Sequence, residues 1–473
     1  MKNTEEITLN INFATNVYIY FIAQIGKCVN SFTTFFSILC IKSDKGDFME
    51  ILRRGSTGSL VSMLQLALKR SGFYSGELDG IFGSRTEAAV RYFQSVNRIR
   101  ADGIVGPVTW RLLEKYIKGY FRYTLRRGDT YWLLANKYGT TVEGIRLANP
   151  DINSDFLQVG QIINIPFGYN VVPTDIPYSY DLTRLVIEGL SVRYPFLQVS
   201  VIGKSVMGKD IYAIRQGRGV REVGYNAAHH ANEWITVPVL LKFVEDYAYA
   251  YANGKAIGTK SAQQLYERAT LFTVPLVNPD GIDLATGALH SGEYYDRAVN
   301  ISEHYPNIRF PDGWKANIAG TDLNLNYPAE WERAKQLKEA QGFVSPAPRD
   351  FVGTAPLSAP ESRVMYDFTQ AHDFRLILAY HTQGEIIYWK FMDYDPPRAQ
   401  EIGEEMSRVS GYPLEITPEF SSYAGYKDWF IQTYNLPGYT VEAGKGVNPL
   451  PISQFDKIYR DNIGILTTGL AEG

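Results

Sequence analysis

The chain has 473 residues, which is too long for one ordinary domain and favours about three. Hydrophobic residues make up 45% and charged residues 21%, a composition that excludes a disordered chain and predicts packed globular domains. The net charge of −3 gives no basic surplus, which argues against a nucleic-acid partner. The two cysteines are Cys28 and Cys40, so disulfides play no part in the chain that follows them.

The N-terminal segment does not resemble a domain. Residues 11–25 and 32–41 are apolar, but neither run reaches the roughly 18 apolar residues of a membrane span. Acidic residues also stand where a signal peptide carries positive charge. We therefore expect residues 1–48 to be an upstream extension and Met49 to be the true start. Peptide mapping of the native N-terminus tests this expectation.

Residues 50–117 contain an internal repeat. The run DGIFG at 79–83 recurs as DGIVG at 102–106, and Asp-Gly pairs mark tight turns. Apolar residues at helical spacing precede each turn, over 60–73 and 86–97. The expected buried positions are Leu60, Met63, Leu64, Ala67, Leu68, Ala89, Val90, Phe93 and Val96. By these residues alone, the segment is a small helical bundle with two similar turns.

The order of motifs in this segment resembles the peptidoglycan-binding helical domain that many cell-wall enzymes carry. The matching pattern is GSxGxxVxxLQ, followed by DGxFGxxTxxAVxxFQ and then DGxVGxxTW, and it covers the whole of 50–117. The resemblance implies a peptidoglycan partner.

Residues 121–167 predict a second small unit. The expected elements are a strand, two helices and a strand, over 123–125, 131–139, 141–149 and 161–165. The first helix is expected to begin at a cap on Asp129 or Thr130 and to end at Gly139. The order of GDT, YG, LxxAN and GQxxxIP resembles the LysM domain, a β-α-α-β module. This resemblance implies binding of glycan strands that contain N-acetylglucosamine.

Residues 176–473 predict one large α/β domain. The runs over 271–278, 375–382 and 437–443 are rich in β-branched and aromatic residues, as expected of buried strands. They alternate with helical patterns such as 234–252. This alternation predicts a mixed, mostly parallel sheet flanked by helices.

Four side chains of this domain could carry chemistry. His230 and Glu233 are three residues apart at the entry of an expected helix, so they can lie on one face and chelate one ion. His381 and Glu442 each stand at the end of an expected strand. Each alone would more often be a structural or surface group. Together, two His and one Glu match the three protein ligands of a catalytic zinc, and a further Glu supplies a base.

The order of motifs resembles the zinc carboxypeptidase family over about 300 residues. The matching motifs are HxxEW at 230–234, PxxNPDG at 275–281, DxNxN at 322–326, the later His381 and the closing Glu442. The resemblance implies one zinc ion on His230, Glu233 and His381, with Glu442 as the general base. It also implies a central eight-stranded mixed sheet flanked by helices.

The DxNxN run departs from the family pattern. The family has an Arg that, with its Asn, holds the free C-terminal carboxylate of a peptide. Here Leu325 replaces that Arg, and Leu cannot form a bidentate pair with a carboxylate. Action on ordinary C-termini is therefore not expected, although Asn324 can still offer a hydrogen bond to the substrate.

Two further catalytic positions rest on the family pattern. Lys315 stands where the family often has an Arg that stabilises the oxyanion, and Lys can supply charge without the fork geometry. A family Tyr precedes the final Glu. Counting back from the Asp-Trp pair, the strict position is Phe420, with Tyr423 and Tyr426 nearby, and we favour Tyr423. We interpret His229, the neighbour of the ligand His230, as structural or as a support for that ligand.

The wall modules, the peptidase domain and the missing Arg together resemble the γ-D-glutamyl-meso-diaminopimelate peptidases of spore-forming bacteria. That resemblance implies hydrolysis of the bond between the side-chain carboxyl of D-glutamate and diaminopimelate in peptidoglycan stem peptides. The alternatives are an ordinary metallocarboxypeptidase and an inactive cell-wall-binding protein. An amidase that cuts at N-acetylmuramic acid would need a different zinc motif.

Peptidoglycan glycan strands and muropeptides are the expected partners, and the sequence gives no firm support for a membrane or protein partner. Without a convincing signal peptide, the site of action stays open between three places. These are the cytoplasm, with imported muropeptides as substrates, the wall or spore after lysis of the mother cell, and the exterior after secretion.

Overall fold

The computed structural model describes residues 50–419 and 422–473. The expectations for residues 1–48 and Met49 lie outside the described residues. In the described part of the chain, no helix combines the length and the apolar character that crossing a membrane requires.

The first unit consists of three helices, α1 (Ser59–Arg70), α2 (Ser84–Val96) and α3 (Pro107–Lys118). All five core positions expected in the first helix are buried, and so are Ala89, Val90 and Phe93 in the second. The prediction for Val96 is wrong, because this side chain is 53% exposed. Val96 is the last residue of α2, so no further turn continues the buried face beyond it.

The two repeated turns are held by two equivalent glutamines. The side chain of Gln65 is fully buried; its Nε2 donates to Asp79 Oδ1 at 2.7 Å, and its Oε1 accepts from the backbone N of Gly80 at 2.9 Å. Gly80 adopts a left-handed φ of 68°, which the tight turn requires. One repeat later, Gln94 bonds in the same way to Asp102, Gly103, Ile104 and Thr109. The sequence repeat is therefore also a repeat of hydrogen bonds.

The second unit has the predicted β-α-α-β order. Its elements are β1 (Tyr120–Thr124), α4 (Tyr131–Tyr138), α5 (Val142–Leu147) and β2 (Ile162–Pro166), and the two strands pair antiparallel. Thr130 caps α4 by accepting from the backbone N of Leu133 at 3.2 Å, and Gly139 ends the helix with a left-handed φ of 64°. Both expected helix ends are thus confirmed.

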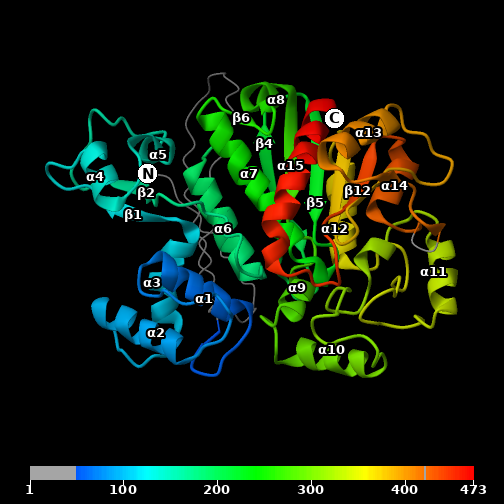
Figure 1. The fold of residues 1–473 in the computed structure, drawn as a ribbon, viewed down its shortest axis with the longest axis horizontal. Helices are drawn as coiled ribbons and strands as arrows, with labels where there is room; N and C mark the ends of the chain where they lie inside the picture. Colours follow the sequence, from blue (N-terminus) through cyan, green and yellow to red (C-terminus); the bar gives the residue numbers. More distant parts are fainter. Residues whose placement is uncertain (1–49, 420–421) are drawn as a thin grey trace, which may run out of the picture. The chain divides into compact units, whose positions relative to one another are not determined.

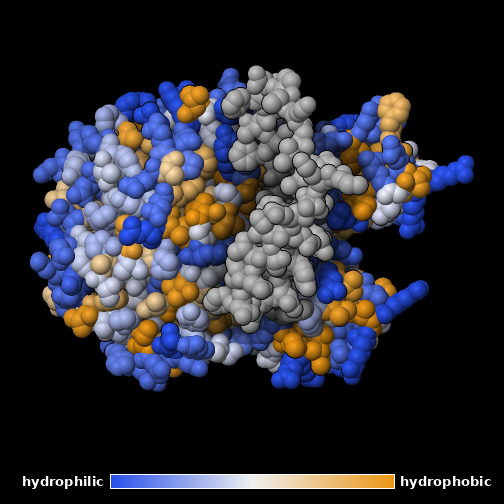
Figure 2. Space-filling view, turned by 180° about the vertical axis from the view of Figure 1, so that it is seen from behind, coloured by the Kyte–Doolittle hydropathy of each residue, from blue (hydrophilic) through white to orange (hydrophobic). Residues whose placement is uncertain are grey.

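This small unit exposes several large apolar side chains. Trp132, Phe156 and Val159 are 65%, 77% and 70% exposed. Figure 2 shows hydrophobic colour on the outer surface of the N-terminal units as well as on the large domain. Large apolar side chains that serve only to pack a core are rarely exposed to this extent.

The large domain is built on one eight-stranded sheet in the order β11-β10-β12-β9-β5-β8-β4-β3 (Figure 1). Its inner strands β12, β9, β5 and β8 are parallel, whereas β10, β4 and β3 pair antiparallel. The predicted mixed α/β sheet is confirmed. The strands are β3 (Gln198–Lys204), β4 (Asp210–Gly217), β5 (Arg221–Ala227), β8 (Ala269–Val274), β9 (Phe374–His381), β10 (Ile386–Tyr388), β11 (Leu414–Glu415) and β12 (Gly438–Glu442). A separate two-stranded hairpin pairs β6 (Ala256–Ile257) with β7 (Lys260–Ser261).

Helices cover both faces of this sheet. The helices of the domain are α6 (Tyr180–Arg193), α7 (Thr236–Ala252), α8 (Ala262–Arg268), α9 (Pro279–Ala285), α10 (Glu293–Glu303), α11 (Trp331–Ala340), α12 (Pro360–Gln370), α13 (Ala399–Ser410), α14 (Tyr426–Tyr434) and α15 (Phe455–Glu472). In Figure 1, α7 and α15 lie across one face of the sheet.

The sheet separates two hydrophobic cores, and β9 contributes to both. Its residues Leu376, Leu378 and Tyr380 join the core that contains α7 and α15. The alternate residues Ile377 and Ala379 join the core that contains α12 and α14. His381 continues this second set, because side chains along a strand alternate between its faces. The strand therefore aims His381 toward the α14 side of the sheet.

Candidate metal centre and active site

Two neighbouring parallel strands end at the candidate metal centre. β5 ends at Ala227, and the register pairs this residue with Tyr380, one residue before His381. From β5 the chain turns through Ala228, which has a left-handed φ of 58°, and enters a short 3-10 turn at Ala231–Glu233. The parallel pairing thus brings His381 beside His230, which lies 151 residues earlier in the chain.

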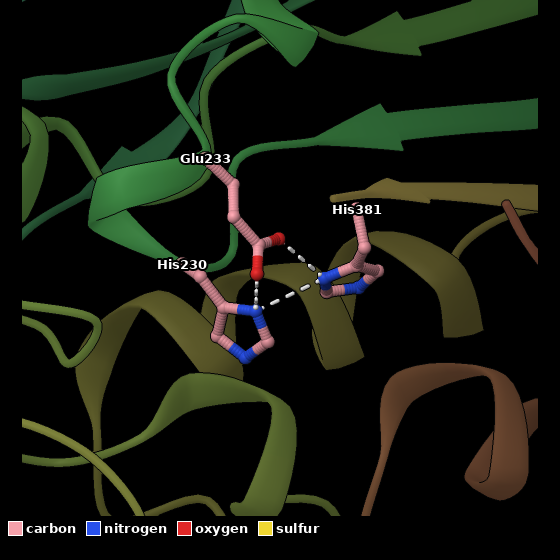
Figure 3. Close-up of side chains that lie close together, drawn as sticks. All are labelled: His230, Glu233 and His381. Atoms are coloured by element: carbon pink, nitrogen blue, oxygen red, sulfur yellow. Dashed lines mark hydrogen bonds and ion pairs between the residues drawn. The ribbon is translucent and has the colours of Figure 1, made fainter. Parts of the chain in front are cut away.

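The three side chains point toward one another, as Figure 3 shows. His230 Nδ1 lies 2.8 Å from Glu233 Oε1, and His381 Nδ1 lies 2.9 Å from Glu233 Oε2. The two Nδ1 atoms are 3.1 Å apart. One ligand atom from each residue falls within 4.8 Å of the others, and all three residues are buried. All three side chains can therefore bind a single ion.

Asp322 holds the orientation of one of these ligands. Its Oδ1 lies 3.1 Å from His230 Nε2, and its Oδ2 accepts from the backbone N of Asp350 at 3.2 Å. With Nε2 bound to a carboxylate, the Nδ1 lone pair of His230 is free for a metal. A carboxylate behind a metal-binding imidazole is typical of zinc sites. The donor set of two imidazoles and one carboxylate fits a catalytic zinc with an open fourth position.

The charges around the site are strongly coupled. Burial alone would raise the pKa of Glu233, but the charges and hydrogen bonds of His230 and His381 bring it well below its usual range. Burial lowers the pKa of His230, and the carboxylates of Glu233 and Asp322 more than offset this, so the net shift is upward. For His381, burial prevails and its pKa is lowered. Glu233 is therefore held as an anion that can accept a cation.

The strand register also places Glu442 at this site. In the parallel pairing of β12 with β9, Glu442 lies directly opposite His381. Residues paired in this way point to the same face of a sheet. Burial raises the pKa of the Glu442 carboxyl to about 8, and the negative charge of Glu233 adds to that shift. Lys315 and His230 act in the opposite direction.

The structure brings Lys315 and Asn324 to the site as well. The carbonyl of Lys315 accepts from the backbone N of Ala231 at 3.0 Å, and its charge lowers the pKa of Asp322. Asn324 donates its backbone N to Asp322 Oδ1 at 3.2 Å. Its side-chain oxygen accepts from the backbone N of Tyr426 at 3.0 Å. Both residues therefore contact the residues that hold the metal ligands in place.

Leu325 and Tyr423 make other contacts. Leu325 is partly buried and packs against the core on the α14 side of the sheet. Tyr423 is 6% exposed, and its hydroxyl lies 3.5 Å from Glu419 Oε1, with the Arg333 guanidinium 4.5 Å from its ring centre. The ring of Tyr423 also meets that of Phe391 edge to face, with the ring centres 6.4 Å apart. Phe420 lies outside the described residues.

The sequence did not single out Asp322 as a functional residue. Its signal was present as the first residue of the DxNxN run, but spacing along the chain could not show which imidazole it contacts. His229, which the sequence assigns a structural role, is buried and its Nε2 lies 3.0 Å from the Tyr327 hydroxyl. Burial holds the pKa of His229 well below its usual range, so it stays neutral beside the metal ligands.

Comparison with known protein families decides the class of this centre. The family model described as zinc carboxypeptidase matches residues 184–464. The chain belongs to the zinc carboxypeptidase family. His230, Glu233 and His381 form its zinc-binding triad. The models of a peptidoglycan-binding domain and of a LysM domain match residues 57–113 and 123–166, which indicates a peptidoglycan partner.

The chain is 43% identical to γ-D-glutamyl-L-diamino acid endopeptidase 1 of Lysinibacillus sphaericus, over 73% of this chain and 98% of that protein. It is 41% identical to an uncharacterised protein of Bacillus subtilis strain 168, over 59% of this chain and 73% of that protein. Among solved structures, thrombin-activatable fibrinolysis inhibitor is 19% identical with a TM-score of 0.49, over 63% of this chain and 77% of that chain.

Proposed function

We propose that this member of the zinc carboxypeptidase family hydrolyses the γ-D-glutamyl-meso-diaminopimelate bond in peptidoglycan stem peptides. The observation that carries the proposal is the 43% identity, over 98% of its length, to a relative named γ-D-glutamyl-L-diamino acid endopeptidase 1. That likeness extends beyond the peptidase domain. The zinc triad and the matches to two wall-associated domains agree with it.

In the proposed mechanism, Glu442 is the general base. His230, Glu233 and His381 would hold the zinc ion, which would supply a Lewis acid able to lower the pKa of water to about 7 and to polarise a carbonyl. Glu442 takes a proton from the attacking water and returns it to the leaving amine of diaminopimelate. Its position opposite His381 in the strand register, and its burial beside the charge of Glu233, support this role.

Three other residues complete the proposed site. Lys315 would stabilise the oxyanion, in agreement with its Coulombic effect on Asp322 and Glu442. Asn324 would contact the substrate, and Tyr423 would close over it from the segment that precedes α14. The hydroxyl of Tyr423 would have to leave Glu419 to do so.

Leu325 supports an endopeptidase rather than an ordinary metallocarboxypeptidase. Its side chain packs into the core on the α14 side and carries no charge. A free C-terminal carboxylate would therefore find no bidentate partner at this position. Release of terminal residues is the competing activity. Digestion of defined stem peptides distinguishes it from cleavage of the γ-D-glutamyl bond.

We propose that the N-terminal units act as tethers. Residues 50–117 and 121–167 would hold peptidoglycan, and residues 176–473 would cut it. Tethering raises the local concentration of stem peptides without new contacts at the active site. The exposed Trp132 and Phe156 supply apolar surface suited to sugar rings.

The test is digestion of L-Ala-γ-D-Glu-meso-diaminopimelate, with and without terminal D-Ala, followed by mass spectrometry. Zinc-loaded wild type is compared with zinc-stripped protein and with Glu442→Gln. We expect L-Ala-D-Glu to accumulate only when zinc and Glu442 are both present. Release of D-Ala alone would show a carboxypeptidase and contradict the interpretation of Leu325. Wall binding without any cleavage would favour an inactive binding protein.

A further inference from the structure

A loop outside the motifs lies directly against the active site. The carbonyl of Pro348 accepts from the backbone N of Lys315 at 2.8 Å and from that of Ala316 at 2.9 Å. The carbonyl of Lys315 in turn accepts from the backbone N of Ala231, next to His230. The loop that carries Arg349 is therefore two hydrogen-bonded steps from a zinc ligand.

A second chain of contacts fixes the same loop. The backbone N of Asp350 donates to Asp322 Oδ2 at 3.2 Å, and Asp322 Oδ1 contacts His230 Nε2. The Asp350 carboxylate is paired with Lys338 at 2.6 Å and with the Nε of Arg349. The base of the Arg349 guanidinium is thus held in place relative to the metal centre.

The outer part of this guanidinium remains available. The Arg349 side chain is 47% exposed, and its Nε makes the contact with Asp350. Among the described residues, its two terminal nitrogens have no hydrogen-bond partner. Burial alone would lower the pKa of Arg349, but the carboxylates of Asp350, Asp322 and Glu233 raise it by more than this. The guanidinium therefore stays a cation. Its pair of free N–H groups presents a fork suited to a carboxylate.

The substrate of the proposed function carries a carboxylate at a distinctive place. A γ-linked D-glutamyl residue keeps its α-carboxylate free, a few carbon atoms from the carbonyl that is attacked. A peptide bond that follows a residue without an acidic side chain has no free carboxylate there. A fixed cation beside the zinc site can therefore favour, by charge, substrates that carry this carboxylate.

We propose that Arg349 binds the free α-carboxylate of the D-glutamyl residue and so favours substrates that carry this carboxylate. This inference rests on the proposed function. Arg349 is a specificity residue and takes no part in the bond-breaking step. Leu325 cannot serve this purpose, because its side chain is apolar and packs into the core.

The test uses two substrates that differ at one group. One is L-Ala-γ-D-Glu-meso-diaminopimelate, and the other has the α-carboxylate of D-Glu converted to a carboxamide. Zinc-loaded wild type should cleave the carboxylate substrate with a kcat/KM about tenfold or more above that of the amide. Arg349→Gln should abolish this preference, mainly by raising KM for the carboxylate substrate. Arg349→Lys should restore part of it, because Lys keeps the charge but not the fork.

Arg375→Gln is the matched control. Arg375 is 52% exposed and pairs with Asp373 at 2.9 Å, but it lies at the opposite end of β9 from His381. Its substitution should leave the preference unchanged.

Three outcomes overturn the assignment of Arg349. Equal cleavage of both substrates by wild type would refute the carboxylate contact while leaving the proposed function intact. An equal loss on both substrates in Arg349→Gln, with weaker zinc retention, would show that Arg349 acts by positioning Asp350 and His230. If wild type cleaves neither γ-linked bond, the proposed function fails and this assignment fails with it.

Discussion

The helical unit and the metal centre are built in opposite ways. In the helical unit, Gln65 bonds to partners 9 to 21 residues further along the chain, and Gln94 bonds to partners 8 to 15 residues further along. In the metal centre, Glu233 contacts His381 across 148 residues and His230 contacts Asp322 across 92 residues. Polar side chains can thus either stabilise a local turn or assemble a site at long range. The second requires the sheet to be formed first.

The largest effect should come from the long-range site. Glu442→Gln keeps the shape of the side chain but removes the base, so kcat should fall by about a thousandfold. Zinc content and wall binding should not change, because Glu442 is not a ligand and the N-terminal units are untouched. Hydrolysis of the stem tripeptide and metal analysis check both points. Glu404→Gln, on the exposed face of α13, should behave as wild type. A loss of less than tenfold in Glu442→Gln would remove Glu442 from the mechanism.

The next effect concerns the support of a zinc ligand. Asp322→Asn keeps the volume but loses the charge behind His230, so zinc affinity should fall about 10- to 100-fold. Competition with a chromophoric chelator measures this affinity. Asp373→Asn is the control, since the Asp373 side chain is 74% exposed at the other end of β9. Unchanged affinity in Asp322→Asn would mean that packing alone orients His230.

Substitutions in the helical unit should lower its stability and leave the rate of peptide cleavage unchanged. Gln65→Ala leaves the buried N–H of Gly80 without its acceptor, which should cost about 1–2 kcal/mol of the local free energy of unfolding. Gln94→Ala should behave alike, because it removes the same bond at Gly103. Hydrogen exchange over residues 50–117 reports the loss, while cleavage of a soluble tripeptide should be unaffected. The exposed Gln400→Ala is the control. A matching fall in activity would show that the two regions are coupled.

The smallest effect is a pH dependence of the same unit. The hydrogen bond from Gln65 lowers the pKa of Asp79. Stability from a carboxyl with a lowered pKa is fully present above its unfolded value, about 3.9, and is lost as pH falls through the folded value. Protection factors over residues 50–117 should therefore decrease slightly as the pH falls below about 4. Asp79→Asn should abolish that part of the decrease, and an undiminished decrease would point to other carboxyls.

Much of this architecture was readable from the sequence because it rests on local patterns. The repeated Asp-Gly turns, the caps at Thr130 and Gly139, and the alternation of strands with helices each follow from neighbouring residues. The prediction for Val96 failed because helical periodicity does not show where a packed face ends.

The sequence by itself determined the types of the small units, the α/β class and the identity of the three zinc ligands. Only the tertiary structure decided which groups meet them. The parallel register places Glu442 opposite His381, and the loop after Pro348 brings Asp350 to Asp322. Burial then sets the pKa of Glu442, which no spacing along the chain reveals. The physical reason is that charge–charge energies depend on distance and desolvation in space, and both are fixed only when the sheet aligns its strand ends.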